Sequence, residues 1–176
     1  MLEIANVVCK ATMDRHLNLD LFASDTEGVV LLNRARNFKA AKIKFGSGTF
    51  MAFPSGVILC LGSKSVDDAR IDVELLSTLL DANVVSFCLC NIVFNGALGS
   101  RVRLNTVFET NPATCSYEAE LYPALYYKPD RNGSSLMALF STGKFYITGV
   151  MDLPTAEQLL TDMKHMIKCS NAYCCS

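Results

Sequence analysis

Two segments of the chain share one pattern of apolar residues around a glycine-containing turn. In residues 136–150 (LMALFSTGKFYITGV), apolar runs lie on both sides of Gly143, a residue that suits a short hairpin turn. Residues 50–64 (FMAFPSGVILCLGSK) repeat the pattern, and Phe53 precedes its match Phe140 by 87 positions. A hairpin that occurs twice indicates that the surrounding chain is duplicated as well.

The rest of the chain supports a duplication. Alternating apolar and β-branched residues predict strands at 2–13, 29–32, 39–45, 49–53, 57–61, 84–95, 124–128, 136–141 and 144–148. Caps and apolar stripes predict helices at 20–28, 65–82, 104–109 and 154–168. Each half therefore reads as a strand, a short helix, further strands and a long helix. We expect one repeat in residues 1–83, a second in 84–170, and a flexible cysteine-rich tail in 171–176.

The sequence predicts N-cap residues for two of these helices and an apolar stripe on one of them. Asp20 is the expected N-cap of the first helix. The helix at 65–82 has Ser65 as its expected cap and an apolar stripe of the kind that faces a core. The stripe consists of Ile71, Leu75, Leu76, Leu79 and Leu80.

Composition indicates a globular chain, with 51% hydrophobic and 19% charged residues. The formal net charge of −1 indicates neither a nucleic-acid nor a membrane partner, and no apolar run is long enough to span a membrane. The N-terminus lacks the pattern of a signal peptide, so an intracellular protein is expected. The eight cysteines include no Cys-x-x-Cys pair and are interpreted as reduced thiols, buried in the body and loose at the tail. We expect no metal, no cofactor and no enzymatic activity.

Several motifs resemble the core of the TATA-box-binding protein family. SYEAELYPALYYK (116–128) is similar to the family's SYEPELFPGLIYR, and LEIANVV and CLCNIV resemble the first strands of its two repeats. PSGVILCLGSKS and STGKFYITG resemble hairpins with the pattern SGKxVxTGAK. The resemblance implies an α+β fold: a pseudo-twofold saddle of two direct repeats. In that fold a curved ten-stranded antiparallel sheet carries four helices on its convex side.

Strand alternation supports a binding role for the other side of the sheet. It places Met51, Phe53, Leu59, Leu61, Phe140, Tyr146 and Thr148 on one face, and Ala52, Ile58, Cys60, Leu139, Phe145 and Ile147 on the opposite face. Both sets are largely apolar, but the helices suffice to cover only one. An uncovered apolar face is typical of a binding surface. A DNA minor groove opened by aromatic wedges suits such a face, with sequence preference coming from easily deformed steps.

The resemblance implies a role for each matching position. The wedge pairs are Phe38 with Phe53 and Tyr122 with Phe140. Asn6 and Asn91 donate hydrogen bonds to the groove, and Val8, Val93, Leu59, Leu61, Tyr146 and Thr148 pack against it. Lys44, Lys64, Lys128 and Lys144 contact phosphates. Glu118, Glu120 and Leu121 bind a IIB-type initiation factor, and a IIA-type factor is a further implied partner.

The chain also departs from the family pattern. Leu61 stands in place of a threonine, Val57 and Met151 in place of lysines, and Tyr122 in place of a phenylalanine. Tyr146 is bulkier than the usual aliphatic residue. The helix at 65–82 has one arginine and no lysine where the family is basic, and the loop at 46–48 is shorter than usual.

Two function classes remain open. The first is a nuclear transcription initiation factor that binds and bends promoter DNA and recruits a IIB-type factor. The second is a saddle-shaped interaction module, or a paralogue with weak or no TATA binding, that engages or sequesters initiation factors. A weak homodimer that forms through the concave face is also expected. An enzyme with this fold is disfavoured, because no carboxylate pair or nucleophile–base pair stands at equivalent positions.

Overall fold

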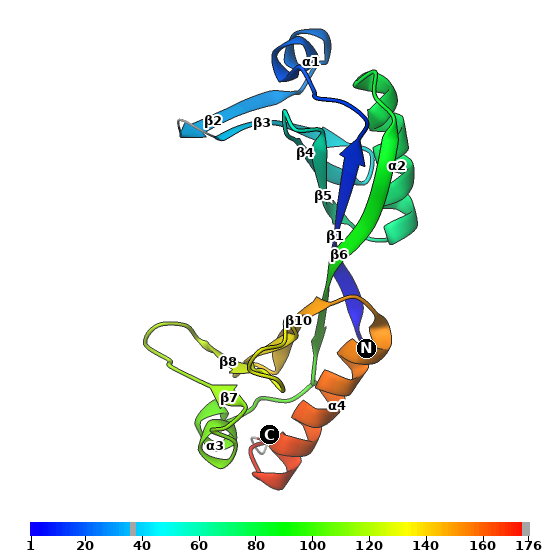
Figure 1. Ribbon diagram of the computed structural model, residues 1–176. Coiled ribbons are helices and arrows are strands. Elements are labelled where there is room, and N and C mark those ends of the chain that lie inside the picture. Colours follow the sequence, from blue (N-terminus) through cyan, green and yellow to red (C-terminus); the bar gives the residue numbers. More distant parts are fainter. Residues whose placement is uncertain (36–37, 174–176) are drawn as a thin grey trace. The chain divides into compact units, whose positions relative to one another are not determined.

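The computed structural model describes residues 1–35 and 38–173. Within them, ten antiparallel strands form one sheet in the order β2-β3-β4-β5-β1-β6-β10-β9-β8-β7, accompanied by four helices (Figure 1). The strands are β1 (Glu3–Met13), β2 (Val30–Ala35), β3 (Phe38–Phe45), β4 (Gly48–Ala52), β5 (Val57–Ser63), β6 (Val84–Ala97), β7 (Cys115–Ser116), β8 (Ala124–Tyr127), β9 (Leu136–Phe140) and β10 (Lys144–Val150). The helices are α1 (Leu19–Asp25), α2 (Val66–Leu79), α3 (Leu104–Thr110) and α4 (Leu153–Cys169). The predicted α+β class with a ten-stranded antiparallel sheet is confirmed.

The chain forms two compact units. The N-terminal unit is Asn6–Asn91, and the C-terminal unit combines residues 1–5 with residues 92–176. The strand at the start of the chain therefore contributes to both units, which a division into two consecutive segments does not anticipate.

Each unit buries one face of its strands under helices. In the N-terminal unit, α2 packs against β5, and α1 packs against β2 and β3. In the C-terminal unit, α4 packs against β10, and α3 packs against β7 and β8. The largest fully buried side chains include Phe50, Ile58 and Leu76 in the first unit and Leu139, Ile147 and Met163 in the second. Burial of these apolar side chains, at roughly 25 cal/mol per Å², holds helices and sheet together.

Local signals explain the helix starts. Ser65 caps α2, as predicted, by accepting a hydrogen bond from Asp68 N at 3.0 Å. The expectation that Asp20 caps the first helix is wrong: Asn18 does so, with Oδ1 accepting from Leu21 N at 3.2 Å. Asp20 lies inside the first turn, where its carboxylate pairs with Lys39 Nζ at 2.6 Å.

The outward side of α2 departs from expectation. Of the predicted core stripe, Leu76 is fully buried, but Ile71, Leu75 and Leu79 are 55%, 54% and 50% exposed. The buried face of α2 is formed instead by Ala69, Asp72, Val73, Leu76 and Ser77. This helix is thus apolar both toward the sheet and toward solvent.

The first residues of the predicted tail contact the rest of the chain. Ala172 is fully buried, its carbonyl accepts from Arg103 N at 2.9 Å, and Tyr173 forms a bridge with Val102. Residues 171–173 therefore belong to the fold, because they close over the segment that precedes α3. Residues 174–176, with two cysteines of the expected tail, lie outside the described residues.

The six described cysteines are free thiols. Cys9, Cys60 and Cys115 are buried, and burial raises the pKa of each thiol, that of Cys9 to about 11. Cys88 and Cys90 are exposed, so the expectation of buried thiols throughout the body is wrong for this pair. They lie on β6, a strand on which only Ile92 and Phe94 are buried. None of the described helices has the length and apolarity needed to cross a membrane.

A buried carboxylate ties the short β3–β4 turn to α2. Asp72 Oδ2 accepts from Ser47 N and from Ser47 Oγ, both at 2.7 Å, and Ser47 Oγ lies 3.0 Å from Ser63 Oγ. The turn approaches the helix closely because Gly46 has no side chain: a Cβ there would collide with the Asp72 carboxylate. Gly46 also has a φ of +52°, a conformation that favours glycine.

We predict that Gly46→Ala destabilises the protein by more than a conformational cost alone. The substitution combines a strained φ with displacement of the Asp72 carboxylate, so the free energy of unfolding should fall by about 1–3 kcal/mol. Gly28→Ala is the matched control, because Gly28 has a φ of +81° but nothing within 4 Å of an added Cβ. Chemical denaturation of both variants measures the difference, and equal losses would contradict the prediction.

Candidate nucleic-acid interface

The N-terminal unit presents a half-buried apolar sheet face. On β4 and β5, Ala52, Ile58 and Cys60 are at most 1% exposed. The residues that alternate with them are only partly buried, and they pair across the strands, Met51 opposite Leu59 and Thr49 opposite Leu61. The predicted division of side chains between the two faces is therefore confirmed in this unit.

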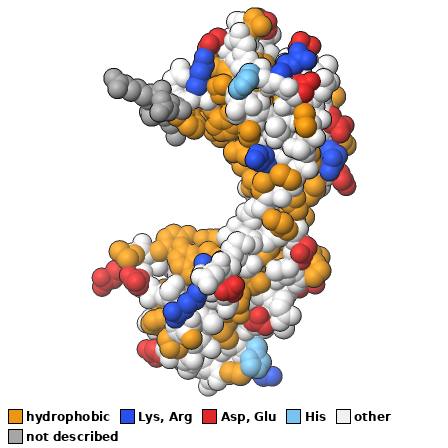
Figure 2. All heavy atoms as spheres, in the orientation of Figure 1, with side chains coloured by type: hydrophobic (Ala, Val, Ile, Leu, Met, Phe, Trp, Pro, Cys, Tyr) orange, Lys and Arg blue, Asp and Glu red, His pale blue; other side chains and the backbone are white. Residues whose placement is uncertain are grey.

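The C-terminal unit repeats this arrangement. Leu139, Phe145 and Ile147 are 0–3% exposed. Phe140, Tyr146 and Thr148, which alternate with them, are partly buried. In Figure 2, hydrophobic side chains gather over the sheet of each unit. Each unit thus keeps apolar side chains on the face that its helices leave uncovered.

An aromatic pair stands at the end of the strands in each unit. Phe38 at the start of β3 and Phe53 just after β4 have ring centroids 6.1 Å apart, in edge contact. Tyr122 and Phe140, which ends β9, have the same separation of 6.1 Å with a tilted geometry. Tyr122 is 40% exposed, and the other three rings are partly exposed. The structure brings together both predicted pairs and leaves them accessible.

Phe38 of the first aromatic pair borders a hollow of about 280 Å³. Its lining consists of Leu32, Phe38, Lys42, Thr49, Met51 and Leu61. Lys42 was not among the predicted site residues, although its register opposite Met51 places it on this face. The signal was available, because Lys42 and Lys44 are two residues apart on one strand and so share a face.

The strand register resolves one departure from the family pattern. Leu61, at the position of an expected threonine, lies directly opposite Thr49. In the C-terminal unit, Thr148 lies directly opposite Leu136. Both units therefore carry one threonine and one leucine at this cross-strand pair, with the two residues exchanged between the strands. The hydroxyl that position 61 lacks is present on the neighbouring strand.

Three tyrosines modify the face of the C-terminal unit. Tyr122 and Tyr126 are stacked at 5.5 Å, and Tyr146 lies 6.3 Å from Phe140. Burial raises the pKa of Tyr146, and hydrogen bonding with the Tyr122 and Tyr126 side chains raises it further. The Tyr146 side chain, which is bulkier than the family pattern at this position, thus belongs to a cluster of three tyrosines whose hydroxyl groups interact.

The predicted polar residues occupy two neighbouring strands. Asn6 on β1 is partly buried, and its Oδ1 accepts a hydrogen bond from Gly62 N, which leaves the amide NH₂ as its donor group. Val8 follows Asn6 on β1 after a register irregularity, and Asn91 and Val93 are partly buried on β6. The structure places these side chains at strand positions that alternate with buried residues.

The predicted phosphate-contacting lysines are not equivalent. Lys44, Lys64 and Lys144 are exposed. Lys128 is partly buried, and its Nζ donates to the Arg131 carbonyl at 3.0 Å. Three of the four are therefore exposed residues, whereas Lys128 is partly buried.

The predicted partner-binding residues lie in the loop before β8. Glu118, Glu120 and Leu121 are exposed, Leu121 by 79%. The Glu118 carbonyl accepts from both Leu121 N and Tyr122 N at 3.0 Å, which closes the turn. This loop therefore presents two carboxylates and one leucine to solvent, beside the exposed Tyr122, a predicted wedge residue.

Within residues 1–35 and 38–173, no group of three or more His, Cys, Asp or Glu side chains could hold a metal ion. His16 and His165 are both exposed. The chemistry of the sheet face consists of aromatic and aliphatic surfaces, carboxamides, hydroxyls and exposed lysines.

We predict that the tyrosine cluster makes stability sensitive to alkaline pH. Because the pKa of Tyr146 is raised above the ordinary value of 10, its contribution to stability is fully present below pH 10 and is lost as the pH rises through the raised pKa. Tyr146→Phe should therefore flatten the decline of unfolding free energy above about pH 10. Denaturation at stepped pH values measures this.

A second component should persist in that variant. Tyr127 is buried, its hydroxyl donates to Asp162 Oδ2 at 3.2 Å, and its pKa is raised to about 12. An unchanged pH dependence in Tyr146→Phe would contradict the role assigned to the cluster.

Comparison with known proteins gives consistent matches over the length of the chain. The family model described as "Transcription factor TFIID (or TATA-binding protein, TBP)" matches twice, at residues 1–82 and 86–169. The TATA-box-binding protein of Haloarcula marismortui is 29% identical and that of Methanothermobacter thermautotrophicus 26% identical, each alignment covering 89% of this chain and 88% of the relative. TATA-box-binding protein 2 of Entamoeba histolytica is 27% identical, with 85% of this chain and 73% of that protein aligned.

The fold is similar to that of a solved structure as well. The structure of the Methanococcus jannaschii TBP matches with a TM-score of 0.78, covering 95% of this chain and 98% of that chain at 24% identity. The family match extends over both halves and includes both aromatic pairs. The chain belongs to the TATA-box-binding protein family of transcription factors.

Proposed function

We propose that the chain is a general transcription initiation factor that binds promoter DNA in the minor groove and bends it. Family membership makes it a DNA-binding transcription protein and not an enzyme. The bending, the recruitment of partners and the residues responsible are our proposal. It includes a division into two direct repeats, residues 1–83 and 84–170, each contributing one half of the interface.

The aromatic pairs carry this proposal. Phe38 with Phe53 and Tyr122 with Phe140 stand at equivalent ends of the two units, at one separation of 6.1 Å, with every ring accessible. Unstacking a base step costs a few kcal/mol in minor-groove binding, of which TATA-box-binding proteins are themselves the standard example. Paired wedges at two points offset that cost and kink the duplex at both.

The remaining face residues supply contacts between the wedges. Leu59, Leu61 and Val8 would pack on the groove floor in the first half, and Val93, Tyr146 and Thr148 in the second. Asn6 and Asn91 would donate to the acceptors that A·T pairs present in the minor groove. Thr49 joins this set as the hydroxyl paired with Leu61.

Charge sets the expected strength of binding. Lys44, Lys64, Lys144 and the newly assigned Lys42 would contact phosphates, and Lys128 would contribute less because it is held by a backbone carbonyl. Each phosphate contact contributes about one unit to the slope of log affinity against log salt. With a formal net charge of −1, the protein should bind DNA with a shallow salt dependence.

A protein-interaction module is the second candidate function. The tyrosine cluster and the near-neutral charge favour it, because both reduce the fit to a polyanion. In that case the same faces would bind protein, as a sequestering paralogue or as a weak homodimer. Gel-shift titration with a TATA-type duplex and a random duplex, at low and at physiological salt, distinguishes the candidates. Binding without preference for the TATA-type duplex would favour the module.

We predict that Phe53→Ala combined with Phe140→Ala abolishes DNA bending. The double variant should remain folded, because both rings are partly exposed and lie outside the fully buried core. Bending is measured by energy transfer between dyes at the two ends of a duplex, and folding by thermal denaturation. Leu75→Ala, on the outer side of α2, is the control and should bend DNA normally. Normal bending by the wedge variant would contradict the proposal.

We propose that the loop before β8 recruits a IIB-type factor, with a IIA-type factor as a further partner and the nucleus as the location in a eukaryotic host. We predict that Glu118→Lys with Glu120→Lys weakens binding of the IIB-type factor about tenfold or more, because two exposed carboxylates are reversed. Calorimetric titration of the factor into wild-type and variant protein measures the change. Glu157→Lys on α4 is the control, and equal affinity for all three proteins would contradict the assignment.

A further inference from the structure

The outer side of α2 carries an apolar stripe that the fold does not use. Ile71, Leu75 and Leu79 recur every four residues, so they lie in one row along the helix. They are 55%, 54% and 50% exposed. Large side chains gathered in this way on a helix surface are typical of a site that a partner covers.

Helix α4 provides an internal comparison. The caps Ser65 and Asp152 correspond at a separation of 87 residues, and three buried positions match at the same separation: Ala69 with Ala156, Asp72 with Leu159, and Leu76 with Met163. The positions in α4 that match Ile71 and Leu75 are Gln158 and Asp162, and Gln158 Nε2 donates to Asp162 Oδ1 at 2.7 Å. At these two positions α4 therefore carries polar side chains that bond to each other, whereas α2 carries two exposed aliphatic side chains.

The stripe leads into a hollow at the end of α2. Leu79 lines a cavity of about 310 Å³ together with Leu17, Phe22 and Leu21, the last of which is 57% exposed. The stripe therefore ends at a pocket large enough to receive one bulky apolar side chain of a partner. Both features lie within the N-terminal unit.

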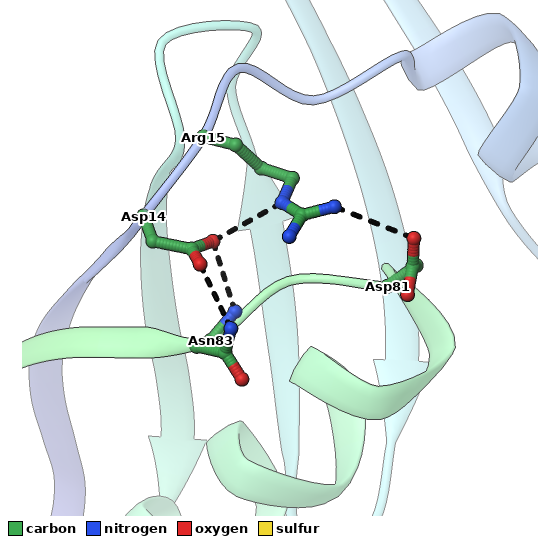
Figure 3. Close-up of polar contacts among 4 residues, drawn as sticks. All are labelled: Asp14, Arg15, Asp81 and Asn83. Atoms are coloured by element: carbon green, nitrogen blue, oxygen red, sulfur yellow. Dashed lines mark hydrogen bonds and ion pairs between the residues drawn. The ribbon is translucent and has the colours of Figure 1, made fainter.

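The rim of this cavity is held by polar contacts between the end of β1 and the loop after α2. Asp14 accepts from Asn83 N at 3.0 Å and from Asn83 Nδ2 at 2.8 Å, and Arg15 contacts Asp14 at 3.2 Å and Asp81 at 3.4 Å (Figure 3). These contacts lower the pKa of Asp14, with the Asn83 hydrogen bonds as the main cause. The pocket wall is therefore preformed, and the basic group beside it is already paired.

The charges around the stripe are acidic. Asp67, Asp68 and Glu74 are exposed on α2, and no ion pair involves them in the described part of the chain. Arg70, the only basic residue of α2, has its guanidinium 4.4 Å from the centre of the Phe87 ring. Asp25 adds a further carboxylate at the cavity.

We propose that the outer side of α2 and the cavity beside Leu21 form a docking site for a basic amphipathic helix of a partner protein. The apolar side of that helix would cover Ile71, Leu75 and Leu79, and one large side chain would enter the cavity. Lysines or arginines on its flanks would face Asp67, Asp68 and Glu74, which gives the charge complementarity that selects a partner. The site does not depend on DNA binding by the sheet faces.

A synthetic peptide tests the site directly. The probe is a labelled helical peptide of about four turns, with leucines four residues apart, one tryptophan at its end and lysines on both flanks. Its affinity for the full chain is measured by fluorescence anisotropy. A matched peptide with glutamate in place of each lysine should bind at least about tenfold more weakly.

Protein variants locate the binding. Leu75→Ser with Leu79→Ser should weaken the lysine peptide about tenfold or more, as expected for loss of central apolar contacts. Met151→Ser, at a residue 59% exposed in the C-terminal unit, should not weaken it, and Phe53→Ala with Phe140→Ala should not either. If the serine variant unfolds, Asp67→Lys with Glu74→Lys provides the second test, because it reverses charge and leaves the leucines in place.

Three results would overturn the proposal. The first is equal affinity of the protein for the lysine and the glutamate peptide. The second is undiminished binding of the lysine peptide by both α2 variants. The third is dimerisation of the wild-type protein that the Leu75→Ser, Leu79→Ser variant abolishes. The last result, measured by analytical ultracentrifugation, would show that a second copy of the chain covers the stripe.

Discussion

The period-two alternation of the strands is the constraint on which the rest of this structure depends. Residues of β4, β5 and β10 largely alternate between buried and partly buried positions, and the helices α2 and α4 pack against β5 and β10. In most sheets the partly buried positions would be polar, but here they include methionine, leucine and tyrosine beside two threonines. The interface thus arises from the geometry that forms the core, and a slip of one residue in register would exchange the two.

The uncovered sheet faces of the two units carry different side chains. Around the first aromatic pair the face is aliphatic, with Leu59, Leu61 and Met51, whereas around the second it is a cluster of tyrosines. Aliphatic side chains offer a groove no hydrogen-bond donor or acceptor, and tyrosine hydroxyls offer both. Corresponding positions of the two units therefore present different side-chain chemistry.

Much of this arrangement could be predicted from the sequence, because alternation and duplication are local patterns. The equivalent places of Phe53 and Phe140 in the two repeats predict their pairing with Phe38 and Tyr122. Features that depend on cross-strand register were not accessible: the opposition of Thr49 and Leu61 becomes visible only when β4 is aligned with β5. Strand β7 has two residues, too few for any alternation. The spacing of leucines in the helix at 65–82 predicts a single apolar stripe, because spacing alone does not separate a buried row from an exposed one.

The exposed row on α2 and the buried Asp72 are best understood together. Asp72 occupies the inner side of the helix, where it anchors the shortened β3–β4 turn through Ser47. This arrangement commits part of the inner side to a polar network, and Ala69, Val73 and Leu76 supply the remaining apolar contact. Ile71, Leu75 and Leu79 therefore cannot be explained as core residues displaced by a small rotation of the helix, because rotation would break the bonds to Ser47. Their exposure is fixed by the same carboxylate that fixes the turn, and a role for them has to be sought outside the N-terminal unit.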